Sequence, residues 1–139
     1  MEERYPLLLP HVPPIRMIDA LDTVEDLTFA SHVTIPQESP YVKAGKLCPE
    51  ALLEVMAQCF AAGMCCKSGK SEPDPGHSWG YLAAIRSFAV KKSVCAGERL
   101  DARCRMLMRV GSIWAIEGNV LRNGEEIAGA QLKLYIPEG

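Results

Sequence analysis

The stretch Cys-Pro-Glu-Ala-Leu-Leu-Glu-Val-Met-Ala-Gln-Cys-Phe-Ala-Ala-Gly-Met-Cys-Cys, residues 48–66, decides how the rest of this 139-residue chain can fold. From Ala51 to Cys66, thirteen of sixteen residues are apolar, and only Glu54 and Gln58 are polar. The Leu, Met and Ala content favours a helix, and a helix that is apolar on all sides belongs in a protein interior or a membrane. Sixteen helical residues rise about 24 Å, which is short for a membrane span of about 20 residues. We therefore predict a buried helix enclosed by other structure.

The polar residues of this segment fall on one face of the helix. Glu50, Glu54 and Gln58 follow each other at intervals of four, which aligns them along one side. An unpaired carboxylate at the depth of Glu54 is costly. The pattern therefore indicates either a dedicated partner or a carboxyl held near neutral for chemistry, with its pKa raised by burial. The alternative is that this face of the helix meets water.

Composition predicts a single domain whose net charge is small. The length fits one domain over residues 1–139. The formal net charge of −2 gives no electrostatic reason to expect nucleic acid or a membrane surface as a partner. The charged N-terminus shows no signal peptide, and six cysteines without a Cys-x-x-Cys pair indicate reduced thiols in a cytoplasmic protein. No His or Cys spacing matches a metal site.

Strand patterns lie on both sides of the helix. Alternating apolar and polar residues predict two strands before it and three or four after it, and Asn123-Gly124 is a strong hairpin signal. A helix this apolar needs a sheet that curves around it, so we predict an α+β fold with a bent antiparallel sheet enclosing one helix. A long edge strand then stays exposed, and edge-to-edge pairing of two copies would cover it. The expected strands are 16–21, 27–35, 79–90, 100–110, 112–121 and 127–136, with loops over 36–47 and 67–78.

Three motifs carry a resemblance to a known family. They are Leu9-Pro10-His11-x-x-Pro14 with Met17-Ile18-Asp19, then Glu54-Val55-Met56-Ala57-Gln58, and then Val94-Cys95-Ala96-Gly97-Glu98-Arg99-Leu100. In this order they resemble motifs of the hotdog-fold 3-hydroxyacyl-[acyl-carrier-protein] dehydratases of the FabZ branch, with Ala96 in place of a Pro. Gly80-Tyr81-Leu82 and Leu134-Tyr135-Ile136-Pro137 resemble the ApeP-like subgroup, which is associated with aryl polyene lipid pathways.

This resemblance implies a fold, an assembly and a reaction. It implies a hotdog fold, in which a bowl of antiparallel sheet surrounds the helix, and dimers with sites at their interface. It implies a thioester substrate carried by acyl carrier protein or CoA, and no cofactor. In these dehydratases a His on the loop before the helix takes a proton from C2 of the 3-hydroxyacyl group. The acid on the helix protonates the departing hydroxyl, and a backbone N–H at the helix start polarises the thioester carbonyl.

The sequence departs from this pattern just before the helix. Residues 36–53 contain no His, and the family spacing counted back from Glu54 places Pro40 at the position of the catalytic His. The family Gly that supplies the N–H falls on Pro49, and proline has no N–H to donate. We place the substrate at the start of the helix, against Pro49 and Ala51.

Glu54, Gln58 and His11 are the side chains expected to form the site. Glu54 is the expected acid, and Gln58, one helical turn later, is expected to contact the substrate and to orient the acid. His11 either pins the N-terminal segment, as the resemblance implies, or replaces the missing base. His32 is expected at the surface, and His77 in an exposed loop.

Basic residues form a second candidate feature. Arg103, Arg105 and Arg109 are expected on one face of a strand, and Lys91 and Lys92 lie near a turn. A basic patch of this kind would steer an acidic acyl carrier protein. The alternative is a solvated outer face of the sheet.

Three functions stay open at this point. The first is a 3-hydroxyacyl-thioester dehydratase with Glu54 as acid and an atypical base. The second is a non-catalytic accessory subunit that binds acyl chains or pairs with an active dehydratase, so that the assembly is a heterodimer of hotdog chains rather than a homodimer. The third is an acyl thioesterase, in which a carboxylate such as Glu54 activates water.

Overall fold

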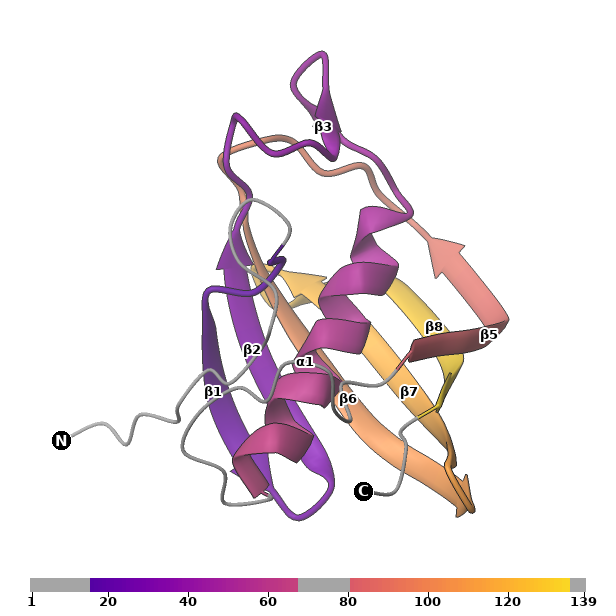
Figure 1. Cartoon of the computed structure of the whole chain (residues 1–139). Helices are drawn as coiled ribbons and strands as arrows, with labels where there is room; N and C mark the ends of the chain where they lie inside the picture. The colour runs from indigo at the N-terminus through magenta and orange to yellow at the C-terminus, as the bar shows by residue number, and fades with distance from the viewer. Residues whose placement is uncertain (1–15, 68–80, 136–139) are drawn as a thin grey trace, which may run out of the picture.

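The computed structural model describes residues 16–67 and 81–135, which form a six-stranded antiparallel sheet, a small hairpin and one helix (Figure 1). The elements are β1 (Ala20–Glu25), β2 (Thr28–Thr34), β3 (Val42–Lys43), β4 (Lys46–Leu47), α1 (Ala51–Lys67), β5 (Tyr81–Val90), β6 (Arg99–Val110), β7 (Ile113–Arg122) and β8 (Glu125–Tyr135). The strand order in the large sheet is β1-β2-β6-β7-β8-β5, so β8 lies between β7 and β5. Helix α1 crosses the concave side of this sheet (Figure 1).

The sheet forms where the alternating pattern predicts it. In β2, Phe29, Ser31 and Val33 are buried, while the residues between them are half-buried. The β7–β8 hairpin turns at Asn123 and Gly124, whose φ angles are 53° and 80°, as the common two-residue hairpin turn requires. The predicted α+β fold, a curved antiparallel sheet around one central helix, is confirmed, and it is the hotdog architecture.

Helix α1 supplies the centre of the core. Phe60 packs between Phe29 of β2 and Trp114 of β7, with ring centroids 5.4 and 6.0 Å away. Full burial of a side chain such as Phe60 contributes about 1.5–3 kcal/mol relative to exposure. The buried residues of α1 are Ala51, Leu52, Leu53, Val55, Met56, Gln58, Cys59, Phe60, Ala62 and Gly63.

Two glycines let the helix lie close to the sheet. A Cβ atom on Gly63 would overlap the ring of Phe29. A Cβ atom on Gly118 of β7 would lie 2.8 Å from the sulfur of Met56. Neither glycine has a positive φ angle, so the close approach of the helix, and not the backbone conformation, requires glycine at both positions.

One side of α1 is not covered by the sheet. Glu54, Ala57, Ala61 and Met64 are half-buried, and their spacing of three or four residues aligns them as one stripe. We call these four residues the open stripe. The prediction of a buried helix holds for most of α1, and the residues of this stripe are half-buried.

Two segments differ locally from the sequence expectation. The expected loop over 36–47 contains the β3–β4 hairpin, whose turn residues Ala44 and Gly45 have φ angles of 52° and 79°. The strand expected from Arg16 begins only at Ala20, although Met17 before it is already buried. Expectations that fall on residues 1–15, 68–80 and 136–139, including those for His11 and His77, lie outside the described residues.

A β-bulge at Leu107 changes the alternation of β6. Met106 pairs with Ile116 of β7, whereas Met108 pairs with the adjacent Ala115, so β6 contains one extra residue. Because side chains alternate between the two faces of a sheet, the extra residue reverses the alternation after it. Met108 therefore lies on the outer face, where it is 60% exposed.

The same bulge separates the arginines of β6. Arg103 and Arg105 flank the buried Cys104 and lie on the outer face. Arg109 lies opposite Trp114 on the helix side of the sheet, with its guanidinium 4.5 Å from the indole centroid. The prediction that the three arginines share one face is therefore wrong.

A carboxylate closes the turn between β5 and β6. Glu98 accepts hydrogen bonds from the backbone N–H of Cys95 at 2.7 Å and from Arg122 of β7 at 3.0 Å. Arg122 also donates to the carbonyl of Ser93 at 2.9 Å. Gly97, with a φ of 90°, allows the sharp bend inside this turn. Glu98 thus ties the turn to β7.

We expect Glu98→Ala to lower the free energy of unfolding by about 1–2 kcal/mol, because a backbone N–H and an Arg lose their acceptor together. The matched control is Glu117→Ala, which removes only an exposed pair with Arg105 at 3.2 Å and is expected to cost about 0.2–1 kcal/mol. Urea denaturation measures both variants. Equal losses would contradict the special role of Glu98.

Candidate active site

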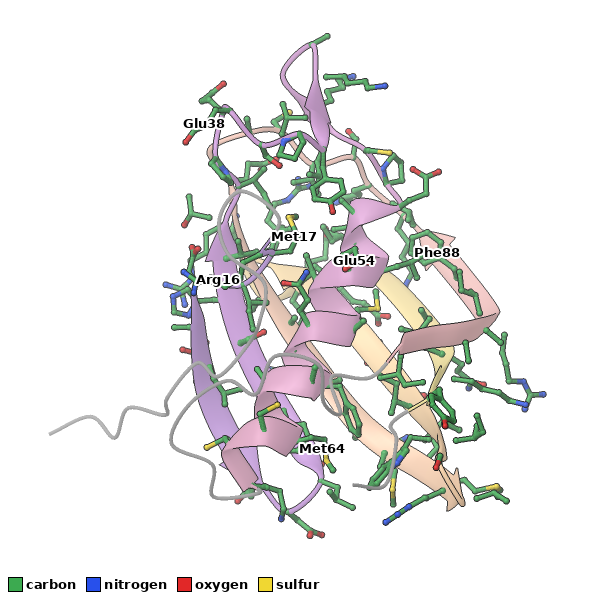
Figure 2. All side chains as sticks on the ribbon, in the orientation of Figure 1. Arg16, Met17, Glu38, Glu54, Met64 and Phe88 are labelled. Carbon is green, nitrogen blue, oxygen red and sulfur yellow. The ribbon has the colours of Figure 1, made fainter. Side chains whose placement is uncertain are left out.

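Glu54 lies in the first turn of α1 and points into the half-buried side of the helix (Figure 2). Its Oε2 atom accepts a hydrogen bond from the side-chain amide of Gln58, at 3.2 Å. Its Oε1 atom accepts no hydrogen bond from the described part of the chain. Two interpretations of the sequence therefore apply to Glu54. It has a dedicated partner, and it also lies on a half-buried face of the helix.

Glu50, Glu54 and Gln58, which the sequence places on one face of the helix, form a polar stripe. Gln58 is the buried end of this stripe and is 2% exposed. Its Oε1 atom accepts a hydrogen bond from the backbone N–H of Met17 at 2.6 Å. Its Nε2 atom donates to Glu54. The prediction that Gln58 contacts the acid one turn earlier agrees with this geometry. The contact from Met17 had no signal in the sequence, because a backbone N–H carries no side-chain pattern.

Glu50 is the exposed end of the same stripe and precedes the helix. Its carboxylate accepts a hydrogen bond from the thiol of Cys48, which lowers the pKa of Glu50. The three polar residues therefore run from solvent at Glu50, through half-buried Glu54, to buried Gln58. This gradient places Glu54 at the boundary between water and the core.

The start of the helix has few backbone donors to offer. Pro49 is exposed, and its carbonyl accepts from Leu52 N–H at 3.0 Å. Ala51 is buried, and its N–H donates to the carbonyl of Cys48 at 3.0 Å. The predicted substrate contacts at Pro49 and Ala51 therefore stay predictions, and neither residue presents an uncommitted N–H.

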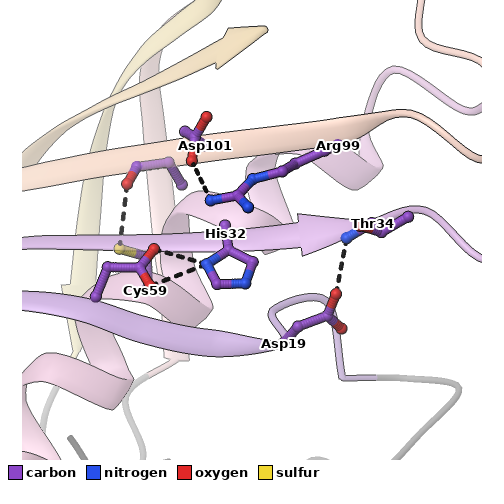
Figure 3. A network of polar contacts seen from close by, with 8 residues as sticks. Asp19, His32, Thr34, Cys59, Arg99 and Asp101 are labelled. Atoms are coloured by element: carbon purple, nitrogen blue, oxygen red, sulfur yellow. Dashed lines mark hydrogen bonds and ion pairs between the residues drawn. The ribbon is translucent and has the colours of Figure 1, made fainter. Parts of the chain in front are cut away.

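His32 is the only histidine within residues 16–67 and 81–135. It lies on the outer face of β2, where its Nδ1 atom lies 2.8 and 2.9 Å from the two carboxylate oxygens of Asp22 (Figure 3). The buried residues of β2 point to the opposite face, toward α1. The expected surface position of His32 is confirmed, and the described residues place no imidazole on the helix side of the sheet.

Two of the basic residues considered in the sequence analysis are paired with acids. Arg105 contacts Glu117 at 3.2 Å, and Lys92 contacts Glu125 at 2.6 Å. The Lys92 hydrogen bond and charge lower the pKa of Glu125. With Arg109 stacked on Trp114 on the other face, the alternative of a solvated outer face describes these residues better than one basic patch.

The cysteines are free thiols. Cys59 of α1 and Cys104 of β6 are buried with their sulfur atoms 3.4 Å apart, and burial raises the pKa of the Cys104 thiol. Protonated, buried thiols act as small apolar side chains and not as nucleophiles.

In the described ranges no three His, Cys, Asp or Glu side chains gather as a metal site. None of the helical structure described is long and apolar enough to cross a membrane.

Comparisons with known proteins cover nearly the whole chain. A family model described as ApeP-like, ApeP dehydratase, matches residues 5–139. A chain of the dehydratase heterocomplex ApeI:P from Xenorhabdus doucetiae has a TM-score of 0.79 and 25% identity, covering 94% of this chain and 88% of that chain. The 3-hydroxyacyl-[acyl-carrier-protein] dehydratase FabZ of Anaeromyxobacter sp. (strain Fw109-5) is 28% identical over 137 residues, which is 94% of this chain and 86% of the relative. The protein of the same name from Campylobacter lari is 25% identical, covering 98% of this chain and 91% of the relative.

Proposed function

This chain belongs to the ApeP-like dehydratase family, and from that premise we propose that it acts as a 3-hydroxyacyl-[acyl-carrier-protein] dehydratase in lipid synthesis. The FabZ relatives and the ApeI:P structure support the same reaction class. The observation that carries the proposal is the Glu54–Gln58 pair, which holds one carboxylate at the boundary between the core and the open side of the helix. The free thiols fit a cytoplasmic location.

The proposed reaction removes a proton from C2 of the acyl group and the hydroxyl from C3, which leaves a C2–C3 double bond and one water. Glu54 delivers the proton that leaves with the hydroxyl, acting as the general acid. Gln58 is bonded through Nε2 to one carboxylate oxygen, so the other oxygen faces the substrate. We place the thioester along the start of α1, against Pro49 and Ala51.

We propose His11 as the base that takes the C2 proton. Residues 36–53, which lead up to Glu54, contain no His, and His32 is bonded to Asp22 on the far face of the sheet. His11 stands two residues before Pro13-Pro14 and six before Met17, whose N–H contacts Gln58. The other possible source of a base is a second chain.

We propose that the working assembly contains a second hotdog chain. The open stripe of α1 exposes a half-buried carboxylate beside small side chains, and β5 is an edge strand with exposed residues such as Ile85. An edge strand presents unpaired N–H and C=O groups, which can pair with a strand of another chain. A heterodimer is favoured over a homodimer because the similar solved structure is a heterocomplex and because this chain lacks the usual loop His.

The isolated chain is expected to turn over slowly, and adding a hotdog partner that carries a His before its own helix is expected to raise turnover at least about 10-fold, since general acid–base catalysis by one positioned group contributes 10²–10⁴-fold. Mass spectrometry of 3-hydroxyacyl and 2-enoyl carrier-protein thioesters, in both directions, measures this. Light scattering reports the assembly.

The outcomes separate the three functions. Turnover by this chain alone, undiminished by His11→Ala, would remove His11 from the mechanism. Turnover by the partner that is unchanged when Glu54 is replaced would leave this chain an accessory subunit. Release of free carrier-protein thiol without dehydration would indicate a thioesterase.

A further inference from the structure

The β3–β4 hairpin carries two lysines that have no acid partner in the described part of the chain. Lys43 and Lys46 are exposed, and they face each other across the hairpin. Residues that are directly opposite in an antiparallel pair place their side chains on one face, and like charges at such positions destabilise the pair. The two ammonium groups therefore concentrate positive charge at one point and weaken the hairpin that carries them.

The turn between these lysines also contains a residue in an unfavourable conformation. Ala44 and Gly45 have φ angles of 52° and 79°. A two-residue turn of this kind favours Asn or Asp at its first position, because a positive φ angle is costly for most other residues. Such residues cluster at functional sites. The hairpin thus combines an unfavourable backbone with two opposed charges, and neither feature strengthens the fold.

Backbone hydrogen bonds hold the hairpin next to the start of α1. The carbonyl of Gly45 accepts from Ala96 N–H at 3.0 Å, and Leu47 N–H donates to the carbonyl of Val94 at 2.8 Å. Only residues 48–50 separate β4 from α1. Figure 1 shows the hairpin at the end of the molecule where α1 begins. The lysines therefore stand on a fixed support beside the region where we place the thioester.

The acids of the neighbouring segments do not neutralise this charge. Glu50 accepts a hydrogen bond from the thiol of Cys48. Glu98, in the turn that contacts the hairpin, is bonded to Arg122 at 3.0 Å. Glu38 lies to the left of the hairpin in Figure 2, whereas the start of α1 lies to its right. The positive charge of the hairpin can therefore pair with acids of another molecule.

We propose that acyl carrier protein docks on the β3–β4 hairpin, with acidic side chains of its surface contacting Lys43 and Lys46. The inference rests on the proposed function, which supplies the acidic carrier protein as the partner. Opposite charge steers such a partner and fixes its orientation. Docking at the hairpin brings the thioester to the start of α1. The lysines bind the protein surface of the carrier, and not a phosphate group that CoA thioesters also present.

The test combines Lys43→Gln with Lys46→Gln in the active assembly. It compares kcat/KM for a carrier-protein thioester with kcat/KM for the pantetheine thioester of the same acyl group. The ratio of the two values is expected to fall about 3- to 30-fold, because two exposed ion pairs are lost. A general loss of activity cancels in this ratio, since the pantetheine thioester contains no protein.

The matched control is Lys67→Gln at the other end of α1, where Lys67 lies 4.0 Å from Asp26. This variant is expected to leave the ratio within about 2-fold, because an exposed pair away from the hairpin does not meet the carrier. An unchanged ratio in the double variant would overturn the docking surface. An equal fall in kcat/KM for the CoA thioester would also overturn it, because the lysines would then bind phosphate.

A charge reversal separates docking from stability. Lys43→Glu replaces the like-charge pair by an ion pair with Lys46, so the urea midpoint of unfolding is expected to be no lower than that of the wild type. The ratio of kcat/KM values is nevertheless expected to fall. If the ratio fell only in variants that unfold at lower urea concentrations, the lysines would have a structural role and the inference would be wrong.

Binding can also be measured without turnover. Fluorescence anisotropy follows labelled carrier protein without an acyl group as it binds the assembly at increasing NaCl concentrations. The double variant is expected to show a smaller salt dependence than the wild type, because salt screens exposed charges. If the wild-type assembly shows no dehydration while binding depends on both lysines, the proposed function fails and the docking surface stands. Dehydration with the same salt dependence in both proteins would overturn the docking surface alone.

Discussion

A Glu54→Gln variant is expected to dehydrate 3-hydroxyacyl carrier-protein thioesters about 10²- to 10⁴-fold more slowly than the wild type, the usual contribution of one general acid. The replacement keeps the shape of the side chain and an oxygen that accepts from Gln58 Nε2. It removes the proton that the carboxyl delivers to the leaving hydroxyl. The effect should therefore fall on kcat, with little change in KM.

The matched control is Glu50→Gln, one helical turn earlier on the same polar stripe. Glu50 is exposed and bonded to Cys48, so its replacement is expected to leave kcat within about 2-fold. Both variants are measured by mass spectrometry of the same thioesters in the same assembly. Full activity of Glu54→Gln would show that the acid is another group, and a loss confined to KM would make Glu54 a binding residue.

The second large effect is expected from a single methyl group. Gly63→Ala should lower the free energy of unfolding by about 1–3 kcal/mol, the usual cost of overpacking a core. The added Cβ overlaps the ring of Phe29. That ring is fully buried and already packed against Phe60, so it has no room to move away. In an uncrowded helix the same substitution would instead gain about 1 kcal/mol.

Whether Gly63→Ala lowers or raises the free energy of unfolding tests how closely the helix lies to β2. Ala61→Gly, on the open stripe of the same helix, serves as the control for helix propensity and is expected to lose about 1 kcal/mol. Combining Gly63→Ala with Phe29→Leu should cost less than the sum of the two single changes, because the smaller side chain leaves space for the new methyl group. A gain in stability for Gly63→Ala, measured by urea denaturation, would show that the helix does not lie this close to β2.

The main elements were predictable because their patterns are long. Sixteen residues with three non-apolar positions define α1, and alternation over about ten residues defines each of the long strands. The Asn123-Gly124 turn was predictable because its residue types match the positive φ angles that it requires. The β3–β4 hairpin was missed, since its strands have two residues each and Ala44 is an uncommon choice at a φ of 52°.

The bulge at Leu107 shows why a correct strand prediction gave wrong faces for the residues after it, such as Arg109. One inserted residue reverses the alternation, and nothing in Arg105-Met106-Leu107-Met108-Arg109 marks where the insertion occurs. The half-buried side of α1 could not be predicted, for a related reason. Composition shows that a helix is apolar, but the number of layers that cover it depends on the sheet and on any second chain.

The side-chain contact in the candidate site was predictable from the sequence, but the contact with a backbone N–H was not. The spacing of Glu54 and Gln58 indicated their contact, because positions four apart on a helix are neighbours. The contact of Gln58 with Met17 spans 41 positions. It depends on the path of the chain into β1, which no local pattern records.

The position of β8 has a consequence for synthesis of the chain on the ribosome. Strand β5 emerges before β6 and β7, yet its hydrogen-bonded neighbour in the described sheet is β8, which is translated last of the strands. At 5–20 residues per second, the wait for β8 is a few seconds. Throughout that interval nascent β5, with Ile85 and Val90 on its surface, has no partner strand in its own chain. Chaperones would protect the unpaired strand during this interval.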